Sequence, residues 1–227
     1  MSISALKAQN KLYGGMGHFY IGPGVYTLSN LESELSKSTA FGNEYSMNPE
    51  MLTIGGGGFG LLNGKWVIGG NGFGAIPFNE SQADEGFTEL AIGGGFFDFG
   101  YVVYNQKESI LFPYIGIGGY GSSLEIENTS DLPIFIGNRE IRAGEFEEIE
   151  GGALAGEIGI SFKSFLFGDN NGGFTLGVDL SYQLGLMEQK WHTENDIRIG
   201  DISNSRLSGF AIRITIGGGG FYSTNEE

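Results

Sequence analysis

The stretch Thr53-Ile54-Gly55-Gly56-Gly57-Gly58-Phe59-Gly60 sets a pattern that recurs along the chain. Its unit is an apolar residue, a cluster of glycines and then usually an aromatic residue. Such repetition indicates one supersecondary element used several times, and it specifies no chemistry. Related stretches begin at Leu12, Val67, Ala91, Gly116 and Thr215.

Length and composition favour a single β-rich domain spanning residues 1–227. A barrel or sandwich of 227 residues often forms one undivided domain. The 42 glycines far exceed ordinary usage, but they cluster without the three-residue period of collagen. With 40% hydrophobic and 13% aromatic residues, the chain has enough apolar material for a folded core.

The charge and the absence of cysteine exclude several classes of function. A net charge of −15 weighs against nucleic acid as a partner and against docking on anionic lipid. Disulfides, thiolate catalysis and cysteine zinc sites are excluded because there is no cysteine. No apolar run is long enough for a transmembrane helix. Residues 1–11 lack the apolar region of a signal peptide, so the protein either stays inside the cell or begins after a removed signal.

Eight segments have the composition of β-strands bounded by turn residues. Asn63-Gly64 is the strongest hairpin signal, because both residues tolerate the positive φ of a type I′ turn. We take residues 1–10 as a lead-in and 223–227 as a polar tail. The predicted strands cover residues 11–26, 51–61, 65–76, 87–104, 109–126, 153–167, 174–187 and 206–222.

The connections between these segments alternate between longer and shorter. In an up-and-down antiparallel sheet, alternate connections lie at the same end, so the longer ones gather at one end and the tight turns at the other. Ser29 or Asn30 can cap a short helix over residues 31–36 in the first long loop. The predicted fold is therefore all-β, an antiparallel up-and-down barrel of about eight strands with one short helix; eight strands close around an interior that side chains just fill.

The last three predicted strands alternate strictly between an apolar and a polar face. In a soluble barrel or sandwich the apolar face would lie inside, whereas in a membrane barrel it would face lipid and the polar face would fill the interior. For a membrane barrel we expect Glu157, Asp179 and Arg213 to point inward. The apolar face would then point outward, including Ile158, Val178 and Ile212.

This layout resembles the small outer-membrane barrels of the OmpA and OmpX type. Residues 210–216 alternate like the last strand of that family, and Phe221-Tyr222 follow as its closing aromatics. The family pattern is broken after Tyr222, because five more residues follow. The resemblance implies an eight-stranded barrel in the outer membrane.

A second resemblance is to Gly-rich bacterial barrel proteins of no known activity. It rests on the glycine hairpin of residues 54–68 and on residues 98–104 leading to 114–119. This resemblance implies a fold and no particular reaction.

Four charged residues share the polar face of consecutive strands: Glu157, Lys163, Asp179 and Arg213. They could act as acid/base pairs or as a gated ionic pore. We favour a structural network, because buried charges must be paired and Arg213 between Glu157 and Asp179 would pair them.

Other chemical signals in the chain are weak. The acidic residues 145–150 lack the spacing of an EF-hand and read as a solvated loop. His18 and His192 lie far apart in sequence, and neither is surrounded by a triad pattern. The glycine clusters lack the lysine and helix of a phosphate loop. We therefore expect no catalytic, cofactor-binding or metal-binding residue and no cofactor.

The sequence favours a non-catalytic outer-membrane or envelope barrel with a structural or surface role. Its expected partners are the lipid bilayer or envelope components, with self-association as a further option. One alternative is a soluble Gly-rich barrel or sandwich that binds a small apolar ligand. Another is an envelope protein that self-assembles by stacking its glycine patches. An enzyme is the least favoured reading.

Overall fold

The computed structural model describes residues 11–37, 41, 45–79, 81–83, 86–106, 109–136, 139–169, 172–193, 199 and 205–224. The lead-in 1–10 and residues 225–227 of the expected tail lie outside this part. In chain order, the elements are β1 (Lys11–Leu28), α1 (Leu31–Leu35), β2 (Glu50–Leu62), β3 (Trp66–Pro77), β4 (Ser81–Ala83), β5 (Gly86–Tyr101), β6 (Tyr104–Gln106), β7 (Ser109–Asn128), β8 (Ile134–Ile136), β9 (Arg139–Ile141), β10 (Phe146–Asp169), β11 (Gly172–Gly185), β12 (Lys190–Thr193) and β13 (Leu207–Thr224).

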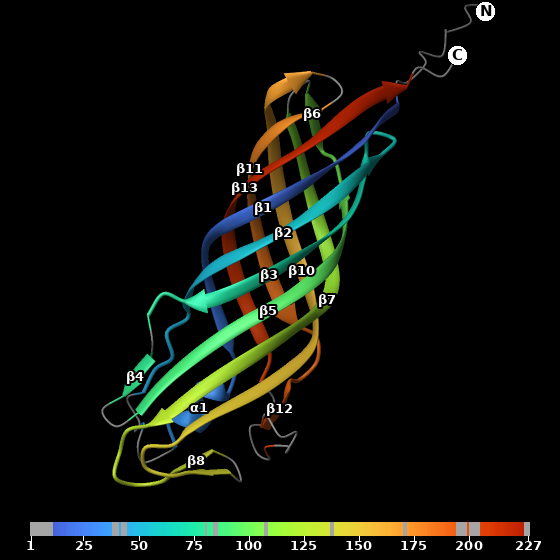
Figure 1. The fold of residues 1–227 in the computed structure, drawn as a ribbon. Coiled ribbons are helices and arrows are strands. Elements are labelled where there is room, and N and C mark those ends of the chain that lie inside the picture. Colours follow the sequence, from blue (N-terminus) through green and yellow to red (C-terminus); the bar gives the residue numbers. More distant parts are fainter. Residues whose placement is uncertain are drawn as a thin grey trace, which may run out of the picture.

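Eight long strands form a closed antiparallel barrel (Figure 1). The order around the wall is β1, β2, β3, β5, β7, β10, β11, β13, and the seam pairs Lys11 of the first strand with Thr224 of the last. Each barrel strand therefore pairs with its neighbours in the chain, as hairpin connections allow. This arrangement confirms the predicted all-β, up-and-down barrel.

The two ends of the barrel differ in the length of their connections (Figure 1). One end, here called the turn end, carries the start of β1, the end of β13 and the hairpin turn between β2 and β3. Asn63 and Gly64 lie there with φ of 53° and 68°, which gives the positive φ values expected of a type I′ turn. The other end, here called the loop end, carries α1, β4, the β8–β9 hairpin and β12. The predicted short helix is present as α1.

One predicted loop is a strand. Residues 146–150 belong to β10, where Phe146 lies opposite Glu127 and Ile149 opposite Leu124 of β7. Glu147 and Glu148 are adjacent in this stretch, so the carboxylates lie on both faces of the strand, and buried Ile149 points into the barrel. The third long connection also contains a strand: β12 pairs Trp191 with Gly151 of β10.

Smaller differences affect the strand ends. β5 ends at Tyr101, and residues 104–106 form a separate strand, β6, against the start of β7. β13 continues through Ser223 and Thr224, which were expected in the polar tail. Asn30 takes the N-cap position of α1 in a left-handed conformation, and its side chain makes no capping hydrogen bond.

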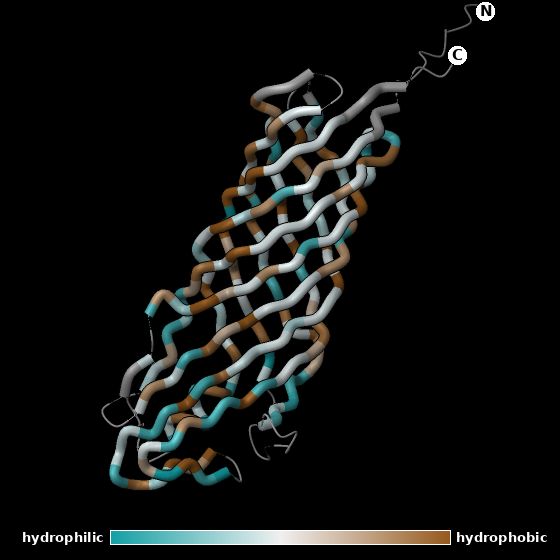
Figure 2. Tube along the Cα trace, in the orientation of Figure 1, coloured by the Kyte–Doolittle hydropathy of each residue, from teal (hydrophilic) through white to brown (hydrophobic). Residues whose placement is uncertain are grey.

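The barrel wall presents its apolar side chains outward. In β13, Ile212 is 43% exposed while the adjacent Arg213 is 1% exposed, and the same alternation runs along β10 and β11. Figure 2 shows the brown positions of these alternating strands. This is the arrangement expected of a membrane barrel: Glu157, Asp179 and Arg213 point inward, and the apolar face points outward.

Glycine replaces these apolar side chains on the opposite part of the wall. In β2 and β3 the outward positions include Gly56, Gly58, Gly72 and Gly74. The tube of these two strands is largely pale in Figure 2. Glycines at inward positions of the wall leave room for aromatic side chains in the interior. At Gly55, for example, a Cβ would lie 2.5 Å from Cζ of Tyr20.

The barrel interior has three layers. Ion pairs and polar side chains fill the middle and are here called the polar layer. A large apolar cluster, the loop-end core, closes one side and includes residues from α1, β8, β9 and β12. A smaller apolar cluster closes the turn end: Met16, Phe59, Leu61, Val67, Val102, Ile110, Phe112 and Tyr114. No helix in the described part of the chain has the length and apolar character to cross a membrane.

Candidate functional site

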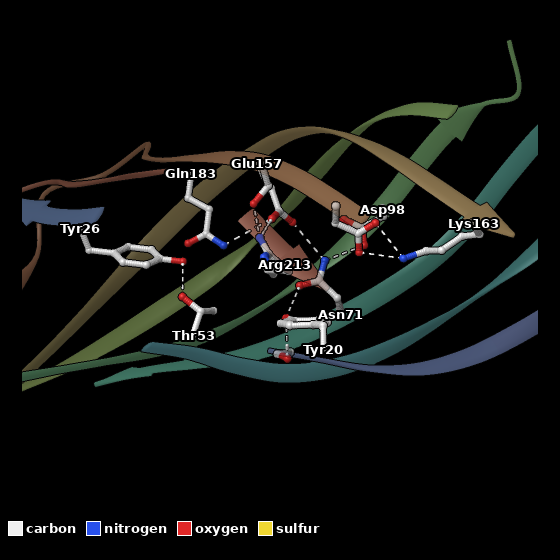
Figure 3. Close-up of polar contacts among 12 residues, drawn as sticks. Tyr20, Tyr26, Thr53, Asn71, Asp98, Glu157, Lys163, Gln183 and Arg213 are labelled. Carbon is white, nitrogen blue, oxygen red and sulfur yellow. Dashed lines mark hydrogen bonds and ion pairs between the residues drawn. The ribbon is translucent and has the colours of Figure 1, made fainter. Parts of the chain in front are cut away.

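The polar layer is the main concentration of chemically active side chains in the described barrel (Figure 3). It exists because β5, β10, β11 and β13 each place polar residues at inward positions of an alternating strand. The four charged residues singled out from the sequence all lie here: Glu157, Lys163, Asp179 and Arg213.

Arg213 and Glu157 form one buried ion pair. Arg213 Nη2 donates to Glu157 Oε1 at 2.7 Å and also contacts the hydroxyl of Ser181. The guanidinium lies over the ring of Tyr20, with 4.7 Å from Cζ to the ring centroid, so a cation–π contact adds to the pair. Gln183 Nε2 donates to the same Glu157 oxygen at 3.4 Å.

Lys163 and Asp179 form the second pair. Lys163 Nζ donates to the two oxygens of Asp179 at 2.7 and 2.9 Å and to Thr215 Oγ1 at 2.8 Å. These three bonds use all three donors of the ammonium group. The expectation that Arg213 would serve both carboxylates was wrong, although Arg213 lies opposite Asp179 in the register. Lys163 reaches Asp179 across Gly177, where a Cβ would lie 2.6 Å from the lysine Cδ.

Three members of this layer were not identified from the sequence: Tyr20, Asn71 and Asp98. Asn71 Nδ2 donates to Asp98 Oδ2 at 2.7 Å and to Glu157 Oε2 at 3.0 Å. The Tyr20 hydroxyl donates to the carbonyl of Gly72 at 2.8 Å. Asn71 and Asp98 lie in glycine-rich strands without apolar–polar alternation, so their direction was not visible in the pattern. A lone amide among glycines and a lone carboxylate between two phenylalanines were the available signal.

A small cavity lies within the polar layer. Its volume of about 40 Å³ is enough to hold water. Several polar atoms on its lining residues are buried without a hydrogen-bond partner: His18 Nδ1, Asp98 Oδ1, Ser161 Oγ and Arg213 Nε.

The remaining candidates from the sequence are not brought together. His18 lines the cavity, whereas His192 lies in β12 at the loop end, opposite Glu150. Within the described residues, no group of three or more histidine, aspartate or glutamate side chains is arranged to hold a metal ion. The inward aromatics Phe96, Phe112 and Tyr114 are buried. Four further aromatic residues of this region lie on the outside of the barrel: Phe97, Phe99, Tyr101 and Tyr104.

Several solved structures are similar to this chain. The Ail protein of Yersinia pestis, the attachment invasion locus protein, is 9% identical over 91% of this chain and 97% of its own, with a TM-score of 0.51. The protease OmpT of Escherichia coli is 9% identical over 95% of this chain and 97% of its own, with a TM-score of 0.42. OprG of Pseudomonas aeruginosa is 11% identical over 95% and 98%, with a TM-score of 0.40. No family model and no curated protein sequence matches the chain.

Proposed function

We propose that this protein is an outer-membrane β-barrel with a structural or surface role, closed to solute flow and without catalytic activity. The observation that carries the proposal is an apolar outer wall around an interior that side chains fill. The fold shared with Ail, an outer-membrane type of barrel, supports the location.

The direction of the side chains favours lipid over water outside the wall. Phe19 is 80% exposed, and the outward faces of β11 and β13 expose continuous rows of aliphatic and aromatic side chains. A soluble protein rarely exposes an apolar surface of that extent. The charged residues Lys163 and Arg213, in contrast, are almost fully buried. The soluble alternative requires the opposite arrangement.

The layers of the interior favour a closed barrel. The polar layer lies between the loop-end core and the apolar cluster at the turn end, so apolar side chains interrupt any polar path along the axis. Both cations of the layer are held by carboxylates or ring faces, which leaves the interior poorly suited to acid/base chemistry on an entering substrate.

The loop end is the surface on which we expect contacts with other molecules. Exposed carboxylates are frequent there, among them Glu127, Glu140, Glu145 and Glu150. Such a surface favours cationic or uncharged partners over polyanions such as sucrose octasulfate, with which Ail has been crystallised.

Single introduced cysteines test both the location and the orientation, since the native chain has none. Phe135→Cys places a thiol in β8 at the loop end, Lys65→Cys places one beside the tight turn between β2 and β3, and Val178→Cys places one on the outer wall. In intact cells, a membrane-impermeant maleimide should label Phe135→Cys only. After the outer membrane is permeabilised, it should also label Lys65→Cys.

The wall position provides the control for embedding. Val178→Cys should stay unlabelled in membranes and react once the barrel is denatured. Rapid labelling of Val178→Cys in intact membranes would mean that this wall faces water and would overturn the membrane location. Planar bilayers containing the purified protein should show no steady ion conductance, and a stable open conductance would refute the closed barrel.

A further inference from the structure

The charges of the polar layer do not balance. Among the described inward positions of the eight barrel strands, this layer contains three carboxylates and two permanent cations, with His18 as a further titratable group. One negative charge therefore lacks a counterpart in a buried layer, where an uncompensated charge is costly. The charged residues are Asp98, Glu157, Asp179, Lys163 and Arg213.

The unbalanced charge lies on Asp98. Lys163 directs all three of its donors to Asp179 and Thr215, and Arg213 directs Nη2 to Glu157 and Ser181. In the described structure, Asp98 accepts one hydrogen bond, from the uncharged amide of Asn71. Its second oxygen, Oδ1, is buried without a partner.

The backbone at Gly116 makes room for this oxygen. Asp98 and Glu157 both lie opposite Gly116 of β7, so a residue without a side chain separates the two acids. A Cβ at Gly116 would lie 2.5 Å from Asp98 Oδ1. Asp98 lines the cavity of about 40 Å³, together with Ser161, whose nearly fully buried hydroxyl also lacks a partner.

We propose that this cavity binds one small monovalent metal cation, sodium or potassium, with Asp98 as its anionic ligand. Water and the Ser161 hydroxyl supply further oxygen ligands from the cavity. One positive charge brings the layer to neutrality and satisfies the buried oxygen of Asp98.

The surroundings favour a single charge on the ion. A divalent cation would leave an excess positive charge in a layer that already holds Lys163 and Arg213. Calcium and magnesium also require six or more well-placed oxygen ligands, which a single carboxylate in a cavity of this size does not provide. Hard oxygen ligands suit an alkali cation better than a transition metal.

Thermal unfolding in different salts tests the proposal. The folded protein in detergent micelles is heated in sodium, potassium or choline chloride at equal ionic strength, and unfolding is followed by circular dichroism. A ligand that binds only the folded state raises the midpoint, so sodium or potassium should raise it above the choline value by a few degrees and saturate with concentration. Asp98→Asn should abolish this difference.

Glu89→Gln serves as the matched control, because Glu89 is a carboxylate on the same strand that faces outward. This variant should keep the dependence of the native protein on the cation. Equal midpoints in all three salts would overturn the proposal and would assign the missing charge to a proton on Asp98 or on His18. A cation effect that persists in Asp98→Asn would overturn it as well.

A direct measurement keeps the proposal testable if Asp98→Asn does not fold. Crystals of the native protein soaked in thallium(I), an electron-dense substitute for potassium, should show an anomalous peak beside Asp98 Oδ1. A cavity that contains only water in such crystals would refute the site.

Discussion

The polar layer and the loop-end core fill the same narrow barrel by different means. In the polar layer, long charged side chains such as Arg213 and Lys163 extend along the inner wall and end on carboxylates of other strands. In the loop-end core, apolar residues of the connections fold back between the strands, with Leu31 and Leu35 of α1 and Ile134 of β8 fully buried. The stability of the polar layer depends on ion pairing, so the loss of one partner leaves the other charge buried and unpaired. The stability of the loop-end core depends on packing, so it falls in proportion to the side-chain volume removed.

The largest loss of stability is expected for a substitution in the polar layer. Arg213→Ala leaves Glu157 without its cation in a buried site, and breaking such a pair costs about 3–5 kcal/mol. Arg139→Ala removes the partner of Glu147 at the loop end, where the arginine side chain is 43% exposed, and should cost roughly 0–1 kcal/mol. Denaturant unfolding in micelles measures both. Equal and small losses would show that the polar layer does not depend on pairing.

A deletion in the loop-end core should have a graded effect. Leu31→Ala opens a cavity beneath α1, and large-to-small changes of buried leucine cost about 2–5 kcal/mol, depending on how far the site collapses. Leu132→Ala, at an exposed position of the same end, should change the stability by about 0.5 kcal/mol or less. The same unfolding assay applies. A negligible loss for Leu31→Ala would mean that the loops do not contribute to the stability of the barrel.

The contact between the core and the wall can be tested from the wall side. Tyr26 lies opposite Gly209 of β13, and a methyl group at Gly209 would overlap the tyrosine ring. Overpacking of this kind typically costs about 1–3 kcal/mol. Gly74→Ala provides the control, because nothing lies within 4 Å of its added methyl group. If Gly209→Ala is as stable as Gly74→Ala, the core is looser than the structure indicates.

The smallest effect concerns a polar group inside the loop-end core. Burial raises the pKa of Tyr45 to about 12, although its hydrogen bond with Thr88 opposes the shift. A raised pKa means that the folded state holds the phenol proton more tightly. The contribution of this proton to the free energy of unfolding is therefore fully present below the unfolded pKa of about 10. It is lost as the pH rises toward 12.

At about pH 11 this loss should be on the order of 1 kcal/mol. Tyr45→Phe has no phenol at this position, so its stability should fall less than that of the native protein over this pH range. Unfolding midpoints of both proteins at neutral and alkaline pH give the comparison. Parallel curves would show that the Tyr45 hydroxyl is not buried in solution.

The two regions also differ in how well the sequence predicts them. Strict alternation placed Arg213 and Ile212 on opposite faces of the wall, because a strand directs successive side chains to opposite sides, and the membrane-barrel interpretation then gave the inward direction to Arg213. The loop-end core is built by connections that have no period, so the role of Ile134 or Trp191 was not predictable. The acidic start of β10 was taken for a loop for a related reason: its carboxylates lie on both faces of the strand, so no apolar–polar alternation marks it.

The polar layer itself was only partly predictable. The alternation places a side chain inside the barrel but does not choose its partner, which depends on side-chain length and on gaps at glycines. Lys163 reaches Asp179 across Gly177, so Arg213 pairs with Glu157 and not with Asp179. Asp98 was missed because phenylalanines lie on both faces of the strand beside it, Phe96 inward and Phe97 and Phe99 outward, so no apolar–polar alternation shows its direction.

The seam between β1 and β13 constrains how the chain can fold. The wall closes when the first strand meets the last, along a register that runs from Lys11 opposite Thr224 to Leu28 opposite Leu207. Contacts between the two ends of a chain form slowly, since the longest possible loop must close first. Until the final 18-residue strand arrives, β1 offers an unpaired edge to any other strand, the condition under which chains aggregate. A chain that ends before β13 would therefore be an open sheet rather than a smaller barrel.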